Sequence, residues 1–118
     1  MYILFTPLAK SDDFARHMKI FEALRDSGHA VRDLLVKDKG SYQRAILVAG
    51  ASEELISKLA SKLGTAYVSM HRTGATIHDG GSVAKVRLRK LDRELAQMEP
   101  NFIHDVTERT YFKLEAAQ

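Results

Sequence analysis

Two residues within a helix-like segment have types and a placement that suggest chemistry. Arg16 and His17 are adjacent, and apolar residues recur around them at helical spacing, so His17 falls in the middle of an apolar helix face. A histidine at such a position must find a hydrogen-bond partner or lose affinity for protons. Two roles follow for His17: a hydrogen-bonded core residue, or, together with Arg16, part of a pocket at the helix start.

Tyr42 is the second candidate. It follows the polar turn 37–40, which contains a glycine, and it opens the apolar run 42–49, which is typical of a buried strand. A tyrosine at a strand end is commonly an amphipathic edge residue. Its ring could equally cover an adenine or a sulfonium, and its hydroxyl could orient a ligand, so both roles stay open.

The third candidate is the loop Gly80-Gly81-Ser82, which precedes a predicted helix. Such a loop offers free backbone N–H groups and a favourable helix dipole to an anion. It is not a Walker loop, because no Lys-Ser or Lys-Thr pair follows at the required spacing. The alternative is that these residues simply begin a helix.

Metal and cofactor chemistry have little support in the sequence. The chain has 5 histidines and no cysteine, no two histidines are four residues apart, and no HExxH motif occurs. His71 and His78 flank one predicted hairpin, which makes a metal site conceivable without favouring it. We therefore predict neither a metal nor a cofactor.

The elements that must position these residues follow the order β-α-β-β-α-β. Apolar runs, capping residues and glycine stops predict strands and helices in alternation. The predicted strands are 2–5, 30–36, 42–49, 65–70 and 75–78, and the helices occupy 11–28 and 52–64. A third helix after Gly80, with the stripe Leu88, Leu91 and Leu95, and a last strand over 106–114 follow. The fold class predicted is α+β: a ferredoxin-like two-layer sandwich with an added C-terminal helix and strand.

Composition limits the class of protein. The chain has 118 residues with a net charge of +3, and we expect one domain over 1–118. No apolar run approaches the ~20 residues of a membrane span. Together with the lack of cysteine, this predicts a cytoplasmic protein without a membrane partner. The basic residues are concentrated at positions that we interpret as a solvated helix face: Lys85, Arg87, Arg89, Lys90 and Arg93.

Several of these residues also match a known family. The chain resembles the small S-adenosylmethionine-degrading enzymes of bacteriophages, described as SAM hydrolases or SAM lyases. The resemblance covers roughly residues 2–81. It is carried by Arg16-His17, Leu24-Arg25, a glycine turn followed by Tyr42 and Ala45, Leu59-Ala60, Tyr67-Val68, and the stretch from Thr73-Gly74-Ala75 to Gly80.

The resemblance implies a trimer of ferredoxin-like subunits with SAM bound between subunits. In that reaction the substrate's own carboxylate attacks the carbon next to the sulfonium and releases methylthioadenosine and homoserine lactone. Nucleophile and leaving group both belong to the substrate, so the protein chiefly positions and desolvates it. The implied biological role is anti-restriction, through removal of the methyl donor from the host cytoplasm.

One departure from the family affects the catalytic residues. The family has a glutamate on the strand after the tyrosine, whereas this chain has Gln43 and Arg44 there. A glutamine can hydrogen-bond an ammonium group but cannot neutralise it. Two outcomes follow: the chain binds SAM without cleaving it, or Glu53 or Glu54 acts with Tyr42 in catalysis. The expected substrate-binding residues are Arg16, His17, Gln43, Gly80, Gly81 and Ser82.

Two alternatives belong to other classes. The predicted element order is shared with RRM domains, which stack RNA bases on aromatic residues of their first and third strands, where this chain has Phe5 and Tyr42. The aromatic residue that should follow in an RRM is missing, so nucleic acid is not the expected partner. The other alternative is a trimeric PII-like regulator that binds an adenine nucleotide between subunits.

Overall fold

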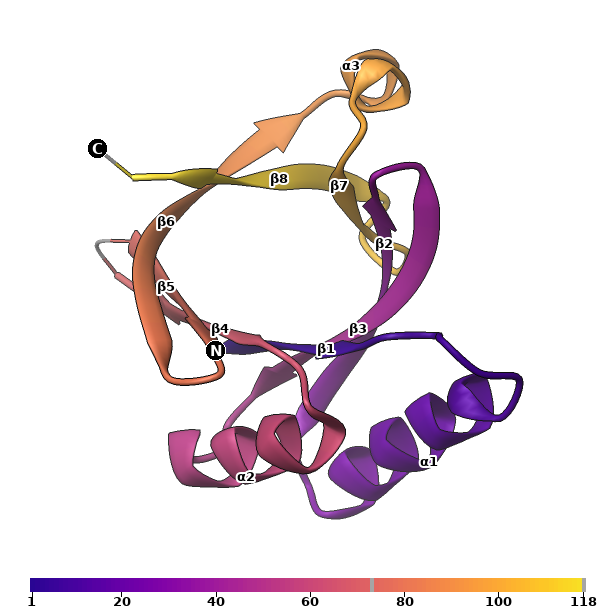
Figure 1. Cartoon of the computed structure of the whole chain (residues 1–118), viewed down its shortest axis with the longest axis vertical. Helices are drawn as coiled ribbons and strands as arrows, with labels where there is room; N and C mark the ends of the chain where they lie inside the picture. The colour runs from indigo at the N-terminus through magenta and orange to yellow at the C-terminus, as the bar shows by residue number, and fades with distance from the viewer. Residues whose placement is uncertain (73, 118) are drawn as a thin grey trace.

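The chain folds into one closed, eight-stranded antiparallel β-barrel with three helices outside it (Figure 1). The computed structural model describes residues 1–72 and 74–117. The strands are β1 (Tyr2–Thr6), β2 (Ala30–Asp38), β3 (Ser41–Ala49), β4 (Tyr67–His71), β5 (Gly74–Asp79), β6 (Ser82–Leu91), β7 (Phe102–Asp105) and β8 (Thr110–Ala116). The helices are α1 (Asp13–Asp26), α2 (Glu53–Leu63) and α3 (Arg93–Met98).

The strand order around the ring shows why the predicted two-layer sandwich is wrong. Strands pair in the order β1-β3-β2-β7-β8-β6-β5-β4, and β4 pairs back to β1. The first four strands and two helices have the predicted β-α-β-β-α-β order. The four later strands, however, extend both edges of that sheet until they meet. Closure satisfies the backbone groups that open sheet edges would leave unpaired.

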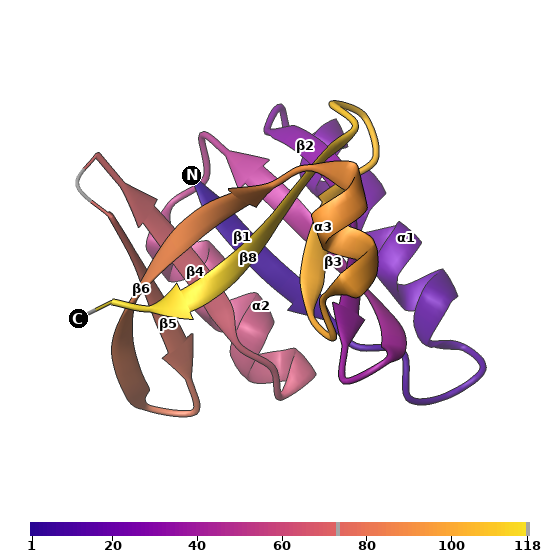
Figure 2. The same cartoon turned by 90° about the horizontal axis from the view of Figure 1, so that it is seen from above.

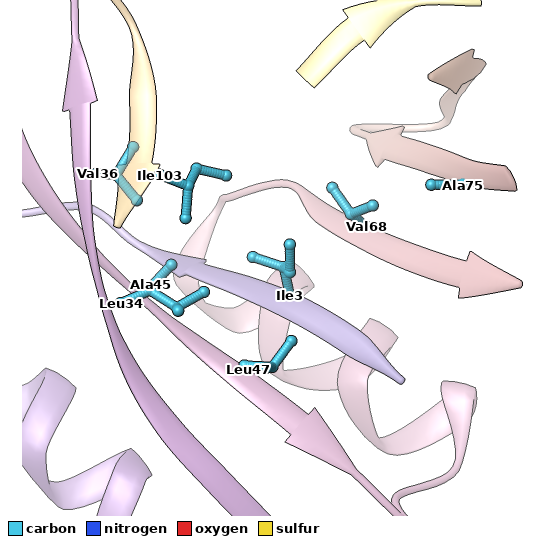
Figure 3. Close-up of a cluster of buried hydrophobic side chains, with 8 residues drawn as sticks. All are labelled: Ile3, Leu34, Val36, Ala45, Leu47, Val68, Ala75 and Ile103. Atoms are coloured by element: carbon cyan, nitrogen blue, oxygen red, sulfur yellow. The ribbon is translucent and has the colours of Figure 1, made fainter. Parts of the chain in front are cut away.

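Strands β1, β3 and β4 are covered on both faces. Inside the barrel, buried apolar side chains from six strands meet in one cluster (Figure 3), with Ile3, Leu34, Ala45 and Val68 essentially inaccessible to solvent. Outside, α1 and α2 pack on these strands, whereas α3 lies on the opposite side of the barrel (Figure 1). The outer layer is a second apolar cluster of Leu4, Leu24, Ile46, Val48, Ile56, Ala60 and Tyr67.

Local sequence fixes the ends of the two long helices. Ser52 caps α2 by accepting a hydrogen bond from the Leu55 amide at 3.2 Å, and α2 ends at Gly64, which is left-handed with φ 65°. The first helix was predicted to begin at Ser11. It begins instead at Asp13, whose carboxylate accepts hydrogen bonds from the Ala9 and Lys10 amides and so orders the loop before the helix.

Two tight hairpin turns depend on left-handed backbone. Asp38 pairs with Ser41, so β2 and β3 are joined by Lys39 and Gly40 at φ 50° and 83°. The same geometry joins β5 to β6, and the two turns have the positive φ values that a two-residue primed turn requires. In the second turn the two residues are Gly80 and Gly81, at φ 56° and 93°.

The predicted third helix after Gly80 is therefore wrong. The loop Gly80-Gly81-Ser82 turns one strand into the next, and the segment after it is the ten-residue strand β6. Leu88 and Leu91 have helical spacing. The stronger pattern is an alternation of charged and apolar residues, which is typical of a strand with one face toward solvent. Helix α3 is only six residues long, and β7 follows it where no strand was predicted.

Among the described residues, no helix is long and apolar enough to cross a membrane.

Candidate functional site

One end of the barrel holds a hollow that we call the barrel mouth. It forms where the end of β1, the β2–β3 hairpin and the start of β7 come together, and its volume is about 410 Å³. Its lining residues come from five strands and three connecting segments: Phe5, Pro7, Val36, Lys37, Asp38, Gln43, Arg44, Thr65, Asn101, Phe102, Ile103, Lys113 and Leu114. Mouths of small barrels are common ligand sites, because eight strands leave room for one small molecule.

The floor of the mouth is apolar and its rim is charged. Phe5 and Leu114 pack against the inner core and are only partly buried, so the mouth leads into the barrel interior. At the rim, Lys37 and Asp38 carry opposite charges, and neither takes part in an ion pair among the residues that the structure describes. Lys37 lies over the Phe102 ring, with 5.6 Å between its Nζ and the ring centroid. A ligand with an apolar body and both charge signs would match this arrangement.

The other cations of the mouth are already paired. Arg44 donates to the Asp33 carboxylate at 3.1 Å, and its guanidinium carbon is 5.5 Å from the centroid of the Phe14 ring. Lys113 forms ion pairs with Glu99 at 3.3 Å and with Glu115 at 3.5 Å. These cations are held in place, which leaves Lys37 as the cation most available to a ligand's carboxylate.

Gln43, predicted to bind substrate, does line the mouth. Its side-chain oxygen accepts a hydrogen bond from the Leu8 amide and so ties the β1–α1 loop to the strand. Its amide nitrogen remains as a donor. In this conformation Gln43 therefore offers an amide N–H to a ligand, while its oxygen is engaged by the Leu8 amide.

The hydrogen-bonded core role predicted for His17 is confirmed. The side chain is fully buried, between the hydroxyl of Thr6 at 2.6 Å from Nδ1 and the carboxylate of Asp33 at 3.0 Å from Nε2. Both ring nitrogens thus have partners, as burial requires. Thr6 is itself only 4% exposed, so the chain Thr6-His17-Asp33 joins α1 to the barrel and offers a substrate no access. Arg16, its neighbour, is exposed and pairs with Asp13 at 3.1 Å.

A second, more polar hollow lies outside the barrel between α2 and the β5–β6 turn. It has a volume of about 460 Å³ and includes Gly80, Gly81 and Ser82, together with Tyr67 and His78. The Tyr67 and His78 rings stack with centroids 4.4 Å apart. Burial, with the nearby charge of Glu53, raises the pKa of the Tyr67 hydroxyl. The glycine loop thus lines a hollow, but not at a helix start.

The structure separates the predicted catalytic residues within one chain. Tyr42 is the second residue of β3 and is 56% exposed, whereas Glu53 and Glu54 begin α2, after the far end of that strand. The seven residue steps from Tyr42 to Ala49 span ~23 Å at ~3.3 Å per step. Glu53 lies 3.7 Å from His78, and Glu54 pairs with Lys58. Any joint action of Tyr42 with these carboxylates requires a second copy of the chain.

Three comparisons with known proteins gave no match, so the geometry of the site is the basis for assigning its chemistry. Neither the protein-family models, nor the curated proteins, nor the solved structures contained a match to this chain. Among the described residues, no group of three or more histidine and carboxylate side chains is placed to hold a metal ion.

Sequence reasoning missed several residues of the mouth. Lys37 and Asp38 were assigned only to a polar turn, and Phe5 only to a strand or an RNA-stacking surface. Their convergence depends on barrel closure, which brings β7 and β8 against β2. One sequence signal does indicate where Lys37 and Asp38 lie. They come directly before a glycine turn, so they are the last residues of a strand and lie where that strand meets its hairpin turn.

Proposed function

We propose that the chain binds S-adenosylmethionine in the barrel mouth and cleaves it as a SAM lyase. The observation that carries the proposal is a hollow of about 410 Å³ with an apolar floor and, at its rim, a cation and an anion that form no ion pair with any described residue. SAM combines an adenosine, a sulfonium, an ammonium and a carboxylate. The resemblance over residues 2–81 supports the choice of this ligand over other zwitterions.

In this proposal each part of the mouth has a role. The adenosine lies against Phe5 and the apolar floor, Asp38 faces the ammonium group, and Lys37 orients the carboxylate. The carboxylate oxygen attacks the γ-carbon and forms the lactone ring. The carbon–sulfur bond breaks and its electron pair goes to sulfur, which leaves neutral methylthioadenosine. No external acid or base is needed, so rate enhancement comes from positioning and exclusion of water.

The homotrimer remains part of the proposal. Tyr42 lies on the hairpin beside the mouth, paired in register with Lys37, and its exposure leaves it open to a second copy. A neighbouring subunit could then present Glu53 or Glu54 to Tyr42. Light scattering coupled to size exclusion tests this, and a monomer of 13.2 kDa would remove these two carboxylates from the proposed site. We place the reaction in the host cytoplasm, where SAM is available.

The RRM alternative loses its main support. An RRM stacks bases on an open sheet face, whereas Phe5 packs against the inner core of a closed barrel.

The test is SAM binding by calorimetry and turnover by chromatography of methylthioadenosine. The mouth variants are Asp38→Asn and Lys37→Gln, and the matched controls on α1 are Asp26→Asn and Lys19→Gln. We expect each mouth variant to bind SAM roughly tenfold more weakly, as loss of one charge-assisted contact implies, with the controls unchanged. Binding without turnover would make the chain a SAM-binding relative, and Gln43→Glu would then be the variant to assay for rescue. No binding by wild type would refute the proposal.

A further inference from the structure

A third hollow, which we call the basic hollow, lies where the β6–α3 turn meets the β7–β8 loop. Its volume is about 600 Å³, and none of its lining residues belongs to the barrel mouth. Three cations line it from separate segments: Lys90 at the end of β6, Arg93 at the start of α3, and Arg109 just before β8. We propose that the basic hollow is a second ligand site, and that its ligand is a nucleoside polyphosphate.

The described residues that line the basic hollow carry three positive charges and one negative charge. Among the described residues, Lys90, Arg93 and Arg109 take part in no ion pair, whereas Arg87 and Arg89, which lie on β6 with Lys90, both pair with Glu115. The one carboxylate in the lining, that of Asp92, accepts the Leu95 amide hydrogen bond at 2.8 Å.

The two nearest acidic residues of the β7–β8 loop are also engaged. Arg32 binds the carboxylate of Asp105 at 2.8 Å and that of Glu108 at 3.5 Å, on the far side of the loop from β6. Three cations that converge with one carboxylate, which is engaged by the Leu95 amide, leave a net positive charge suited to a ligand with several negative charges, such as a polyphosphate.

An aromatic pair beside the cations suits a planar base. The rings of His104 and Tyr111 stack with centroids 4.2 Å apart and an interplanar angle of 17°. Both are half-buried, and Tyr111 is fixed from behind by the edge of Phe102, with centroids 5.5 Å apart. A rigid, partly exposed ring provides a stacking surface for a nucleobase at little entropic cost.

The backbone of the β7–β8 loop holds Arg109 in an unusual conformation. Arg109 has φ 57°, in the left-handed region that residues with large side chains rarely adopt. The turn is held by the Asp105 carboxylate, which accepts the Glu108 amide hydrogen bond at 3.2 Å. The side chain of Arg109 thus leaves the loop from a fixed backbone position at the hollow.

The test uses the full chain and three probes by calorimetry: ATP, adenosine and inorganic tripolyphosphate. We expect ATP to bind more tightly than either fragment. Arg109→Asn, whose new residue tolerates left-handed backbone, and Arg93→Gln should each weaken ATP and tripolyphosphate by roughly fivefold or more. His104→Ala should weaken ATP and adenosine while leaving tripolyphosphate unchanged.

Two matched controls separate site effects from general charge effects. Lys39→Asn removes one cation from the other described non-glycine residue with positive φ, and Arg25→Gln removes one from the surface of α1. Neither control variant should change ATP affinity. Asp38→Asn, in the barrel mouth, should also leave ATP affinity unchanged. The SAM site and the polyphosphate site can therefore fail independently in these experiments. Equal ATP affinity in wild type and all basic-hollow variants would overturn the proposal. Binding of a short RNA without binding of ATP would overturn it as well.

Discussion

The two parts of the barrel bury their strands in different ways. In the helix-covered part, residues 2–71, β3 has four consecutive buried residues, Ala45 to Val48, because the core lies on one face and α1 and α2 on the other. In the bare part, residues 74–116, β6 has one buried residue, Leu91, among ten. The comparison teaches that a layer of helices changes how much of each strand is buried. Helix-backed strands are buried on both faces and form the rigid wall of the barrel, whereas the outer face of β6 stays open to solvent.

The largest expected difference between the two parts is in the stability lost when a leucine side chain is truncated to alanine. Leu4 is fully buried in the outer cluster, so Leu4→Ala should lower the free energy of unfolding by about 2–5 kcal/mol. Leu88 is 39% exposed, so Leu88→Ala should cost about 1 kcal/mol or less. Urea unfolding of both variants measures the difference. Equal losses would contradict the division into a rigid and a bare part.

The next effect concerns the hydrogen-bond chain Thr6-His17-Asp33 of the helix-covered part, here called the polar clamp. His17→Ala removes the partner of the buried Thr6 hydroxyl and one partner of Asp33, which keeps its ion pair with Arg44. It should lower the free energy of unfolding by about 1–3 kcal/mol. His29→Ala, at the end of the α1–β2 turn, is the control and should cost less. His17→Gln should keep most SAM turnover if the clamp is structural. A well-folded His17→Gln that lost turnover by orders of magnitude would assign His17 a catalytic role instead.

A smaller effect should be visible only in acid. Hydrogen bonds from the Lys10 and Ala9 amides, aided by Arg16, hold the pKa of the Asp13 carboxyl below its ordinary value. Because the folded pKa is lowered, this stabilisation is present above the ordinary carboxyl pKa and is lost as pH falls through the folded value. Asp13→Asn should therefore lose less stability than wild type between about pH 7 and about pH 3, in parallel urea titrations. Parallel losses would show that Asp13 is not linked to folding.

The smallest effect is expected on the outer face of the bare part. A hydrogen bond from Arg89, and further ones from Arg87 and Lys113, hold the pKa of the Glu115 carboxyl below its ordinary value. The Arg87 and Arg89 side chains are at least half exposed, so salt screens their charges. Glu115→Gln should lower the thermal midpoint slightly at low ionic strength, and the difference from wild type should shrink at high salt. A large, salt-independent loss would mean that Glu115 supports the barrel wall itself.

The helix-covered part was well predicted from the sequence because its local signals agree. Ser52 with two glutamates after it, Gly64 at the helix end, and an apolar strand on either side all indicate the same element order. His17 was also interpretable, since a histidine on an apolar helix face needs partners once it is buried.

The bare part was poorly predicted because its signals conflict. Leu88, Leu91 and Leu95 fit a helical period, while Lys85, Arg87 and Arg89 fit an alternating strand. The segment forms strand β6 because it pairs with β5 on one side and β8 on the other. The barrel mouth could not be predicted because its residues meet only after closure, and no local pattern specifies a ring.

The most direct test of the central claim is to map SAM binding onto the isotope-labelled chain by NMR. The account predicts that backbone amide shifts on titration with SAM are concentrated at Phe5, Lys37, Gln43 and Ile103, around the barrel mouth, and that Lys58 and Arg87 stay unchanged. Shifts confined to other surfaces, or no shifts at saturating SAM, would contradict the assignment of the barrel mouth as the SAM site.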